Sequence, residues 1–293
     1  MRLIAILLSL WLNRFADRVD AWRDPAPFLR YAARVYAKVK PRRPGDGILP
    51  LLALLGPPLL LAVFLQWLFS GWLLGLVNLL FGIWALLFAH GPGSVDAQMH
   101  AFSQAWREGR SEDARDAVER LSAADGGVVD AEHVTTAQVI EGYFWQCFRR
   151  GLAPLFWFVL LGPVGAILVR LVELIRQFAL QQQQEEAQAI GQSSAALSFA
   201  LDWLPARAAA LAMGLAGSLV HALEGWKDSR NDPDEGPRGL VVRAASGALN
   251  QPTYVAEPEA VDELLADARG LMNRTLMVWL AVIALLTIAG WVP

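Results

Sequence analysis

Long stretches of the chain contain almost only apolar residues, and these stretches predict membrane-crossing helices. From Ile48 to His90 there is no Lys, Arg, Asp or Glu. About forty such residues suit two spans, because one span needs about 20. Ser70-Gly71, near the middle, is the expected turn. Pro57-Pro58 is expected to bend the first helix of the pair. Neighbouring helices must then satisfy the carbonyls that these prolines leave without a partner.

Three further apolar stretches predict three more spans, at about 152–180, 204–223 and 276–292. The run Leu3 to Leu12 is too short to cross, because each helical residue adds only about 1.5 Å. We expect it to lie at the interface or within the bundle. The pattern thus predicts an all-α, polytopic helical membrane protein with about five transmembrane helices, a short N-terminal helix and cytoplasmic amphipathic helices. If 204–223 only lies on the interface, four spans remain.

The polar segment 91–150 shows the period of amphipathic helices. Ser94 is a suitable cap for a helix whose apolar face carries Val95, Met99, Phe102 and Trp106. Gly109 is expected to end this helix, and Ser111 can cap a second one. The buried stripe of that second helix is predicted to be Ala114, Ala117, Val118 and Leu121. A third helix is expected to run from about Ala131 towards the membrane.

Basic residues indicate the side on which each loop lies. Arg14 to Arg43 holds nine Lys or Arg against three acids, so it is expected to be cytoplasmic. Gln177 to Phe199 has no Lys or Arg and is expected outside. The loop after 223 is expected inside, and it moves outside if there are only four spans. The predicted segments are a short helix with a basic segment (1–46), a transmembrane hairpin (47–90), a cytoplasmic helical region (91–150), two membrane helices with a non-basic loop (151–223), a polar loop (224–273) and a C-terminal span (274–293).

Composition strengthens the membrane assignment and excludes other classes. Hydrophobic residues make up 55% of the 293 residues, and the mean hydropathy is +0.36. Charged residues are 18%, below the roughly 25% of soluble domains. A net charge of −3 offers no large basic surface, so the lipid bilayer and not nucleic acid is the expected partner. Cys147 is the only cysteine, and no Cys/His spacing typical of a zinc site is present.

Ionisable residues at the edge of an apolar stretch are candidates for function. The stretch "LDWLPARAAAL" (201–211) places Asp202, Pro205 and Arg207 at the start of the predicted 204–223 span. Pro205 suits the first turn of a helix, so the helix is expected to begin near Leu204. Asp202 would then precede the positive end of that helix. Glu141, about ten residues before the next apolar stretch, is the stronger functional candidate.

Four motifs in order resemble a known family. They are "RSEDARDAVERLS" (110–122), "LAPLFWFVLLGPVGA" (152–166), "LDWLPARAAALAMGL" (201–215) and "AASGALN" (244–250). Together they resemble the CobD/CbiB–AmpE family of bacterial inner-membrane proteins, and the closing "VIALLTIAGWV" (282–292) is similar to its AmpE branch. The resemblance covers roughly residues 100–292, and more loosely the start of the chain.

The two branches of this family differ in their polar residues. The ligase branch, which joins an amino-alcohol or its phosphate to a corrinoid acid, carries a pattern like V-E-S-x-A-E-N-x-x-D-G-V-x-A-P. Here Ile140-Glu141 matches V-E, but Trp145, Gln146 and Arg149 replace Glu, Asn and Asp. Carboxylates and amides are the groups expected to hold Mg²⁺ and to transfer protons. Their replacement indicates that the scaffold is kept and the ligase site is not.

A second ligase motif, S-P-N followed by a Glu, is changed in the same way. Pro237 matches its Pro, but Arg238 replaces the Asn, and the Glu falls near Val242 or Arg243. The resemblance therefore favours the AmpE branch, which is described as an inner-membrane accessory of β-lactamase induction and muropeptide signalling. It implies a multi-pass inner-membrane protein that binds a small cell-wall-derived ligand, or another protein, at its cytoplasmic face.

The candidate residues follow from the charged positions and from these motifs. Glu141, Asp202, Arg207, Arg238 and Asn250 are the candidates for a ligand or polar site. Pro154, Pro163, Pro205 and Gly247 are the structural motif residues. No metal site is expected, and no cofactor is assigned.

Two other functions remain open. One is an amide ligase of the cobalamin pathway. The other is a transporter, suggested by Arg170, Glu173 and Arg207 near membrane depth. The transporter is weakened by the five-span count and by the lack of an internal repeat. These charges could also serve only to orient the helices.

Overall fold

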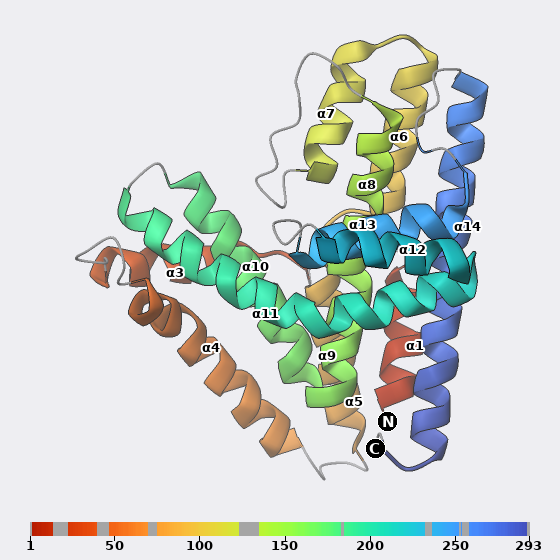
Figure 1. Cartoon of the computed structure of the whole chain (residues 1–293). Coiled ribbons are helices and arrows are strands. Elements are labelled where there is room, and N and C mark those ends of the chain that lie inside the picture. Colours follow the sequence, from red (N-terminus) through yellow and green to blue (C-terminus); the bar gives the residue numbers. More distant parts are fainter. Residues whose placement is uncertain are drawn as a thin grey trace. The chain divides into compact units, whose positions relative to one another are not determined.

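The computed structural model describes residues 2–13, 23–39, 47–69, 75–122, 135–182, 185–231, 236–251, 253 and 258–291. Their regular structure is all helical (Figure 1), which confirms the all-α prediction. The turn expected at Ser70-Gly71 and the helix start expected near Ala131 lie outside the described residues. The elements are α1 (Arg2–Asn13), α3 (Ala26–Lys38), α4 (Ile48–Phe69), α5 (Leu76–His90), α6 (Val95–Arg107), α7 (Ser111–Ser122), α8 (Thr136–Cys147), the π-helix η4 (Phe148–Leu152), α9 (Ala153–Leu161), α10 (Pro163–Gln181), α11 (Glu185–Ala216), α12 (Leu219–Asn231), α13 (Gly236–Leu249) and α14 (Pro258–Ile288).

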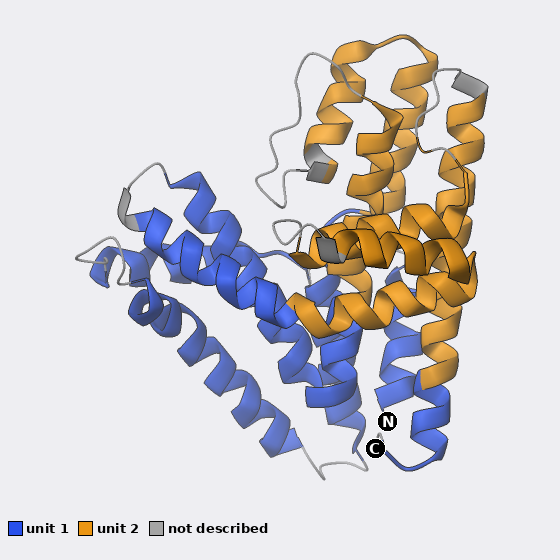
Figure 2. Ribbon diagram, in the orientation of Figure 1, with its two compact units in different colours: residues 1–93, 153–201, 283–293 blue, residues 94–152, 202–282 orange. Residues whose placement is uncertain are grey.

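The chain divides into two compact units (Figure 2). Unit 1 comprises residues 1–93, 153–201 and 283–293, and unit 2 comprises 94–152 and 202–282. The division falls inside α11 and inside α14. Each unit is therefore built from segments that are far apart in the sequence.

Unit 1 is organised around α10, which packs against α4, α5 and α9. Its core joins apolar side chains from α3, α4, α5, α10 and the start of α11. The amphipathic helix α3 contributes Phe28, Ala32 and Tyr36, which recur at helical spacing and are buried. Tyr36 meets Phe178 of α10 edge to face, with ring centroids 5.8 Å apart. The short helix α1 packs on α5 within the same unit.

Within the described parts of the chain, four helical stretches are long and apolar enough to cross a membrane. They are Ile48–Phe69, Leu76–Arg107, Ala187–Ala216 and Ala260–Ile288. The two helices of the predicted hairpin are present, with Pro57-Pro58 inside α4 as expected. The predicted 152–180 span is instead broken between α9 and α10, where Gly162 has a positive φ of 71°. The described residues thus contain four candidate spans, but these are not the four that the sequence left open, because the 152–180 stretch and not the 204–223 stretch is the one without a span.

The predicted helix start near Leu204 is wrong. Helix α11 begins at Glu185 and runs to Ala216, with Pro205 inside it, and the chain then turns at Gly217 before α12. Asp202 therefore lies within a helix and not before its positive end. The final helix also begins earlier than the predicted 276–292 span, at Pro258.

Pro57 inside α4 and Pro205 inside α11 each leave one carbonyl without its helical donor, and a side chain from another helix supplies it. Pro57 has no N–H for the carbonyl of Ala53, and the Tyr31 hydroxyl of α3 donates to that oxygen at 2.9 Å. In the same way, Pro205 leaves the carbonyl of Leu201, which accepts from the Trp157 indole of α9 at 3.0 Å. Both contacts follow the expectation that neighbouring helices satisfy backbone freed by proline.

The break between α9 and α10 is bridged by one side chain of α4. Gln66 accepts from the backbone N–H of Val164 at 3.2 Å, and its Nε2 lies 3.4 Å from the carbonyl of Leu161. A Cβ on Gly162 would lie only 3.2 Å from Gln66 Oε1, so glycine also leaves space for this amide. Two backbone groups at a helix break are thereby partnered by a single side chain.

Unit 2 contains the predicted layer of polar helices. Ser94 caps α6 by accepting from the Ala97 N–H, and Met99 and Phe102 are fully buried. The stripe predicted for α7 is buried throughout: Ala114, Ala117, Val118 and Leu121. Ser111, expected as its cap, is the first residue of α7.

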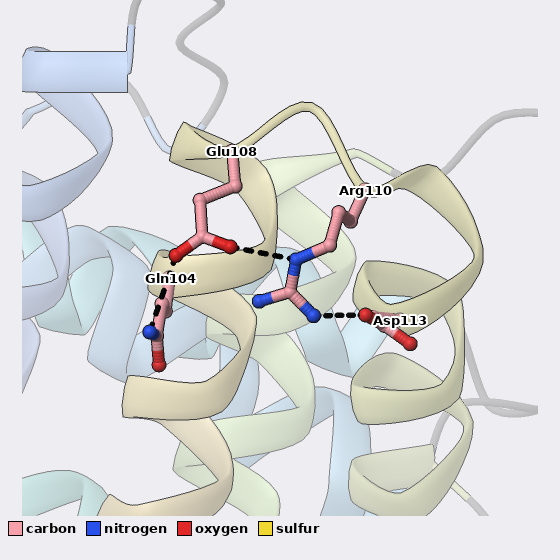
Figure 3. Close-up of polar contacts among 4 residues, drawn as sticks. All are labelled: Gln104, Glu108, Arg110 and Asp113. Carbon is pink, nitrogen blue, oxygen red and sulfur yellow. Dashed lines mark hydrogen bonds and ion pairs between the residues drawn. The ribbon is translucent and has the colours of Figure 1, made fainter.

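Gly109, with a φ of 67°, ends α6 as expected. At this turn the Arg110 guanidinium lies between Glu108 and Asp113 (Figure 3), with its Nε 2.7 Å from the Glu108 carboxylate. Gln104 donates to the same Glu108 carboxylate at 3.2 Å. All of these side chains are on the surface, so the pairs orient the turn more than they stabilise it.

The segment predicted as a polar loop, 224–273, is largely helical. Helices α12 and α13 lie side by side in unit 2 and form an extensive helix–helix contact. Glycines allow this approach, since a Cβ on Gly225 would lie 2.4 Å from the Arg243 carbonyl oxygen. A Cβ on Gly247 would lie 2.3 Å from the His221 carbonyl oxygen. The resemblance implies that Gly247 is a structural residue. In the fold it lies where the backbones of α12 and α13 come into close contact.

Candidate functional site: a polar cavity beside α8 and α13

A polar cavity of about 550 Å³ lies in unit 2, with its walls on α8 and α13. On α13 the residues that face it recur at helical spacing, while the opposite face is buried in the unit. Glu141 of α8 is exposed, whereas Arg238 and Arg243 of α13 are half-buried. The lining residues are Glu141, Arg238, Gly239, Val242, Arg243, Ser246 and Thr253.

The start of α8 fixes the position of Glu141. Thr135 accepts from the Gln138 N–H at 3.4 Å, and Gln138 accepts from the Thr135 N–H at 3.0 Å, which makes a capping box. The hydroxyl of Thr136 donates to the carbonyl of Thr253 at 3.0 Å. Thr253 lines the cavity, so this contact holds the segment after α13 against the first turn of α8.

Further along, α8 is held by polar contacts within unit 2. The Tyr143 hydroxyl lies 3.2 Å from the Asp96 carboxylate of α6, and Arg269 of α14 pairs with the same carboxylate at 3.2 Å. Burial raises the pKa of the Tyr143 phenol well above its usual value, so the phenol stays protonated and can donate. The Gln146 amide also donates to the carbonyl of Leu121 at the end of α7, at 2.8 Å. Glu141 is thus presented by a helix fixed at several points.

The charged side chains of the cavity suit a ligand that carries both negative and positive groups. Two guanidinium groups provide planar, always-charged donors for carboxylate or phosphate oxygens. Glu141 provides an acceptor for an ammonium group. Ser246 and Thr253 add hydroxyl groups that can donate or accept. Among the described residues no group of three His, Cys, Asp or Glu is placed to hold a metal ion.

The cavity brings together two of the residues proposed from the sequence, Glu141 and Arg238. The other three lie elsewhere. Asn250 follows the end of α13 in a left-handed conformation, φ 55°, and its N–H donates to the Gly247 carbonyl at 3.0 Å. Such a conformation is typical of the residue that ends a helix.

Asp202 and Arg207 both lie on α11 and do not line the cavity. Asp202 is buried, with 4% of its surface exposed. The Arg207 guanidinium stacks on the Trp203 ring, 3.6 Å from its centroid, and donates to the Trp203 carbonyl at 2.8 Å. Of the structural prolines, Pro154 and Pro163 lie at the starts of α9 and α10, while Pro205 is internal to α11.

Sequence reasoning gives no site role to Arg243, Ser246 or Thr253. In the sequence, Arg243 is noted only because the Glu of the second ligase motif would fall near it. A helical period through 239, 242 and 246 places Ser246 on the same face as Gly239, but the polar composition of this segment predicts a loop. Thr253 comes from a turn whose position no periodic pattern reveals.

The fold and this cavity define a class: a helical, polytopic membrane protein with a separate helical unit that offers a charged cavity. A family model described as "Regulatory signalling modulator protein AmpE" matches residues 1–292. The chain therefore belongs to the AmpE family.

Individual relatives come from both branches of the resemblance. The chain is 26% identical to a cobalamin biosynthesis protein CobD of Chromobacterium violaceum over an alignment of 298 positions that covers 94% of this chain and 93% of that protein. It is 28% identical to the protein AmpE of Shigella flexneri over 215 residues, 71% of this chain and 74% of that protein. A CobD of Stutzerimonas stutzeri is 28% identical over 248 residues, 78% of each chain. No solved structure matches.

Proposed function

We propose that this protein is a regulatory protein of the bacterial inner membrane that acts in muropeptide signalling and β-lactamase induction. It binds a small cell-wall-derived ligand in the cavity that contains Glu141, Arg238 and Arg243. The observation that carries the proposal is the grouping of two arginines and one carboxylate in one cavity, within a chain of the AmpE family. Peptide fragments of the cell wall carry free carboxylates and a free amine, which these groups complement.

The proposal is tested by direct binding. A peptidoglycan-derived peptide with free carboxylates and a free amine is titrated into the purified full chain, and heat is measured. Replacing both Arg238 and Arg243 by Gln should weaken binding by at least tenfold, because a hydrogen bond to a charged group contributes about 1.5–3 kcal/mol. Arg115→Gln, which changes an exposed arginine of α7 paired with Glu119, is the matched control and should bind as wild type.

The same variants test the signalling role in cells. A strain that lacks the gene should show altered β-lactamase induction. The wild-type and Arg115→Gln chains should restore it, and the double arginine variant should not. Equal affinity of the double variant and the control for the peptide, or no effect of the deletion on induction, would refute the proposal.

A second candidate function is the amide-forming ligase reaction of cobalamin biosynthesis. Its support is the similarity to two CobD proteins, one of which covers 94% of this chain. Against it, two of the replaced positions belong to the interior of unit 2 and not to the cavity lining. Trp145 stacks on Phe148 with ring centroids 5.2 Å apart, and the Arg149 guanidinium lies over the Trp145 ring at 5.5 Å. ATP-dependent amide formation from a corrinoid acid and aminopropanol, or its phosphate, would establish this function instead.

A further inference from the structure

A second cavity lies in unit 1 and differs in character from the polar one. It is an open groove of about 680 Å³, with walls on α3, α4, α5 and α10. Its lining is aliphatic and aromatic apart from the carboxylate of Asp24 and the hydroxyl of Tyr31. The Tyr31 hydroxyl already donates to the Ala53 carbonyl, so the carboxylate is the main polar feature of the groove.

Aromatic rings form the α5 wall of the groove. Phe81, Trp84 and Phe88 recur at helical spacing, and all three line the groove. The Trp84 ring is parallel to both of its neighbours, with ring centroids 5.9 Å from Phe81 and 5.6 Å from Phe88. These separations are typical of offset stacking, which leaves part of each ring face uncovered. Such faces are electron-rich and attract cations.

The α3 wall combines two more rings with the carboxylate. Phe28 and Tyr31 line the groove with their ring centroids 6.0 Å apart. Asp24 lies two residues before α3 and lines the groove with them. Its Oδ1 accepts from the Ala26 N–H at 2.9 Å, which orients the carboxylate at the start of the helix. A carboxylate has acceptor sites on both oxygens, so Oδ2 can still bind a positive group.

The charge of the groove is negative. Asp24 is the one charged residue among the described residues that line it. Arg23, the neighbour of Asp24 in the chain, is fully buried outside the lining, and its guanidinium donates to the Asn13 amide at 2.6 Å. An anionic ligand would therefore be repelled by the groove, and a neutral ligand would gain nothing from the carboxylate. A cation would interact favourably with both the carboxylate and the ring faces.

We propose that this groove binds a hydrophobic organic cation, that is, a soluble molecule with an aryl or alkyl body and one positive centre. The apolar body packs against the α4 and α5 walls, and the positive centre binds at the α3 wall, where Asp24 and Phe28 lie. Charge complementarity selects the cation, and the aliphatic and aromatic lining selects an apolar body. This site is independent of the ligand proposed for the polar cavity, which belongs to the other unit.

The test compares two probes of the same shape and opposite charge, tetraphenylphosphonium and tetraphenylborate. Binding of each to the purified full chain is measured by equilibrium dialysis, with the same mild detergent in both chambers, and each variant is compared with wild type. Asp24→Asn should weaken phosphonium binding by about two- to fivefold, the range of an exposed ion pair, and should not weaken borate binding. The Asn side chain can still accept from the Ala26 N–H, so the start of α3 is kept. Glu112→Gln, which changes an exposed carboxylate of unit 2, is the matched control and should bind both probes as wild type.

A second pair of variants tests the aromatic wall. Trp84→Leu should weaken phosphonium binding by about twofold or more, because it removes a cation–π partner. Trp67→Leu is the matched control, because Trp67 is 70% exposed on α4 and does not line the groove. Equal effects of these two variants, or an equal loss of phosphonium and borate binding in Asp24→Asn, would indicate only general apolar binding and overturn the proposal. Displacement of the phosphonium by phosphatidylethanolamine as readily as by dodecyltrimethylammonium would also overturn it, because a membrane lipid would then be the occupant.

Discussion

The hydrogen bond from Trp157 to the Leu201 carbonyl leads to a testable prediction. The Leu201 carbonyl requires a side-chain donor because Pro205 has no N–H to donate to it. In Trp157→Phe that carbonyl loses its donor, and Pro205 has no N–H to replace it. An acceptor left without a donor away from water costs about 1–3 kcal/mol. We therefore expect the free energy of unfolding to fall by that amount, together with the smaller packing loss of the ring.

A double-mutant cycle with Pro205→Ala separates the free energy of this hydrogen bond from the packing loss of the ring. That substitution restores a backbone N–H at position 205, which can donate to the Leu201 carbonyl within α11, so the indole is no longer required. Trp157→Phe should then cost only the smaller packing loss of the ring, and a coupling energy of about 1–2 kcal/mol should separate the two backgrounds. The packing loss is common to both backgrounds and cancels.

The assay is unfolding of the purified chain by a denaturing detergent, followed by the loss of helical circular dichroism. Trp291→Phe is the control for the chemical change, because Trp291 is 80% exposed. If Trp157→Phe costs as much in the Pro205→Ala background as in wild type, the donor-replacement argument is refuted.

Three further changes, two of which remove hydrogen-bonding groups and one of which adds a Cβ, are each measured as a change in the free energy of unfolding by the same titration. Tyr31→Phe removes the donor to the Ala53 carbonyl and should cost about 1–3 kcal/mol, and the loss should shrink in a Pro57→Ala background. Gln66→Leu keeps a side chain of similar volume but removes the amide that bonds to the Val164 N–H and the Leu161 carbonyl, so a loss of similar size is expected. Gly247→Ala places a Cβ 2.3 Å from a backbone oxygen and should be strongly destabilising, whereas Gly270→Ala, whose nearest heavy atom is 3.4 Å away, should be neutral or stabilising.

The sequence predicted most accurately those elements whose structure depends on residues close to them in the chain. Helical periodicity and caps located α6 and α7, because burial of one helix face and satisfaction of the first N–H groups leave a visible pattern. The apolar run at Ile48–His90 located the hairpin, because backbone groups in hydrocarbon must bond within helices. Glu141 and Arg238 were also proposed as site residues and line one cavity, although their shared location depends on how α8 and α13 pack.

The sequence failed where a distant side chain decides the local structure. Pro205 has the pattern of a helix start, yet α11 continues through it, and Trp157, 44 residues before Leu201, supplies a donor to the Leu201 carbonyl. Gly162-Pro163 lies in an apolar stretch that suits a single span, yet the helix breaks there and Gln66 occupies the break. No window along the chain contains both partners of either contact.

The Gln66 contact has a consequence for the order in which the chain assembles. The Val164 N–H and the Leu161 carbonyl find their partner on α4, a helix that is synthesised about a hundred residues earlier and is long enough to enter the bilayer before α9 emerges. Until α9 and α10 reach α4, both groups lack this partner. We therefore expect the α9–α10 break to reach its final structure only after docking on α4, and a chain made without α4 should be open to proteolysis at the break.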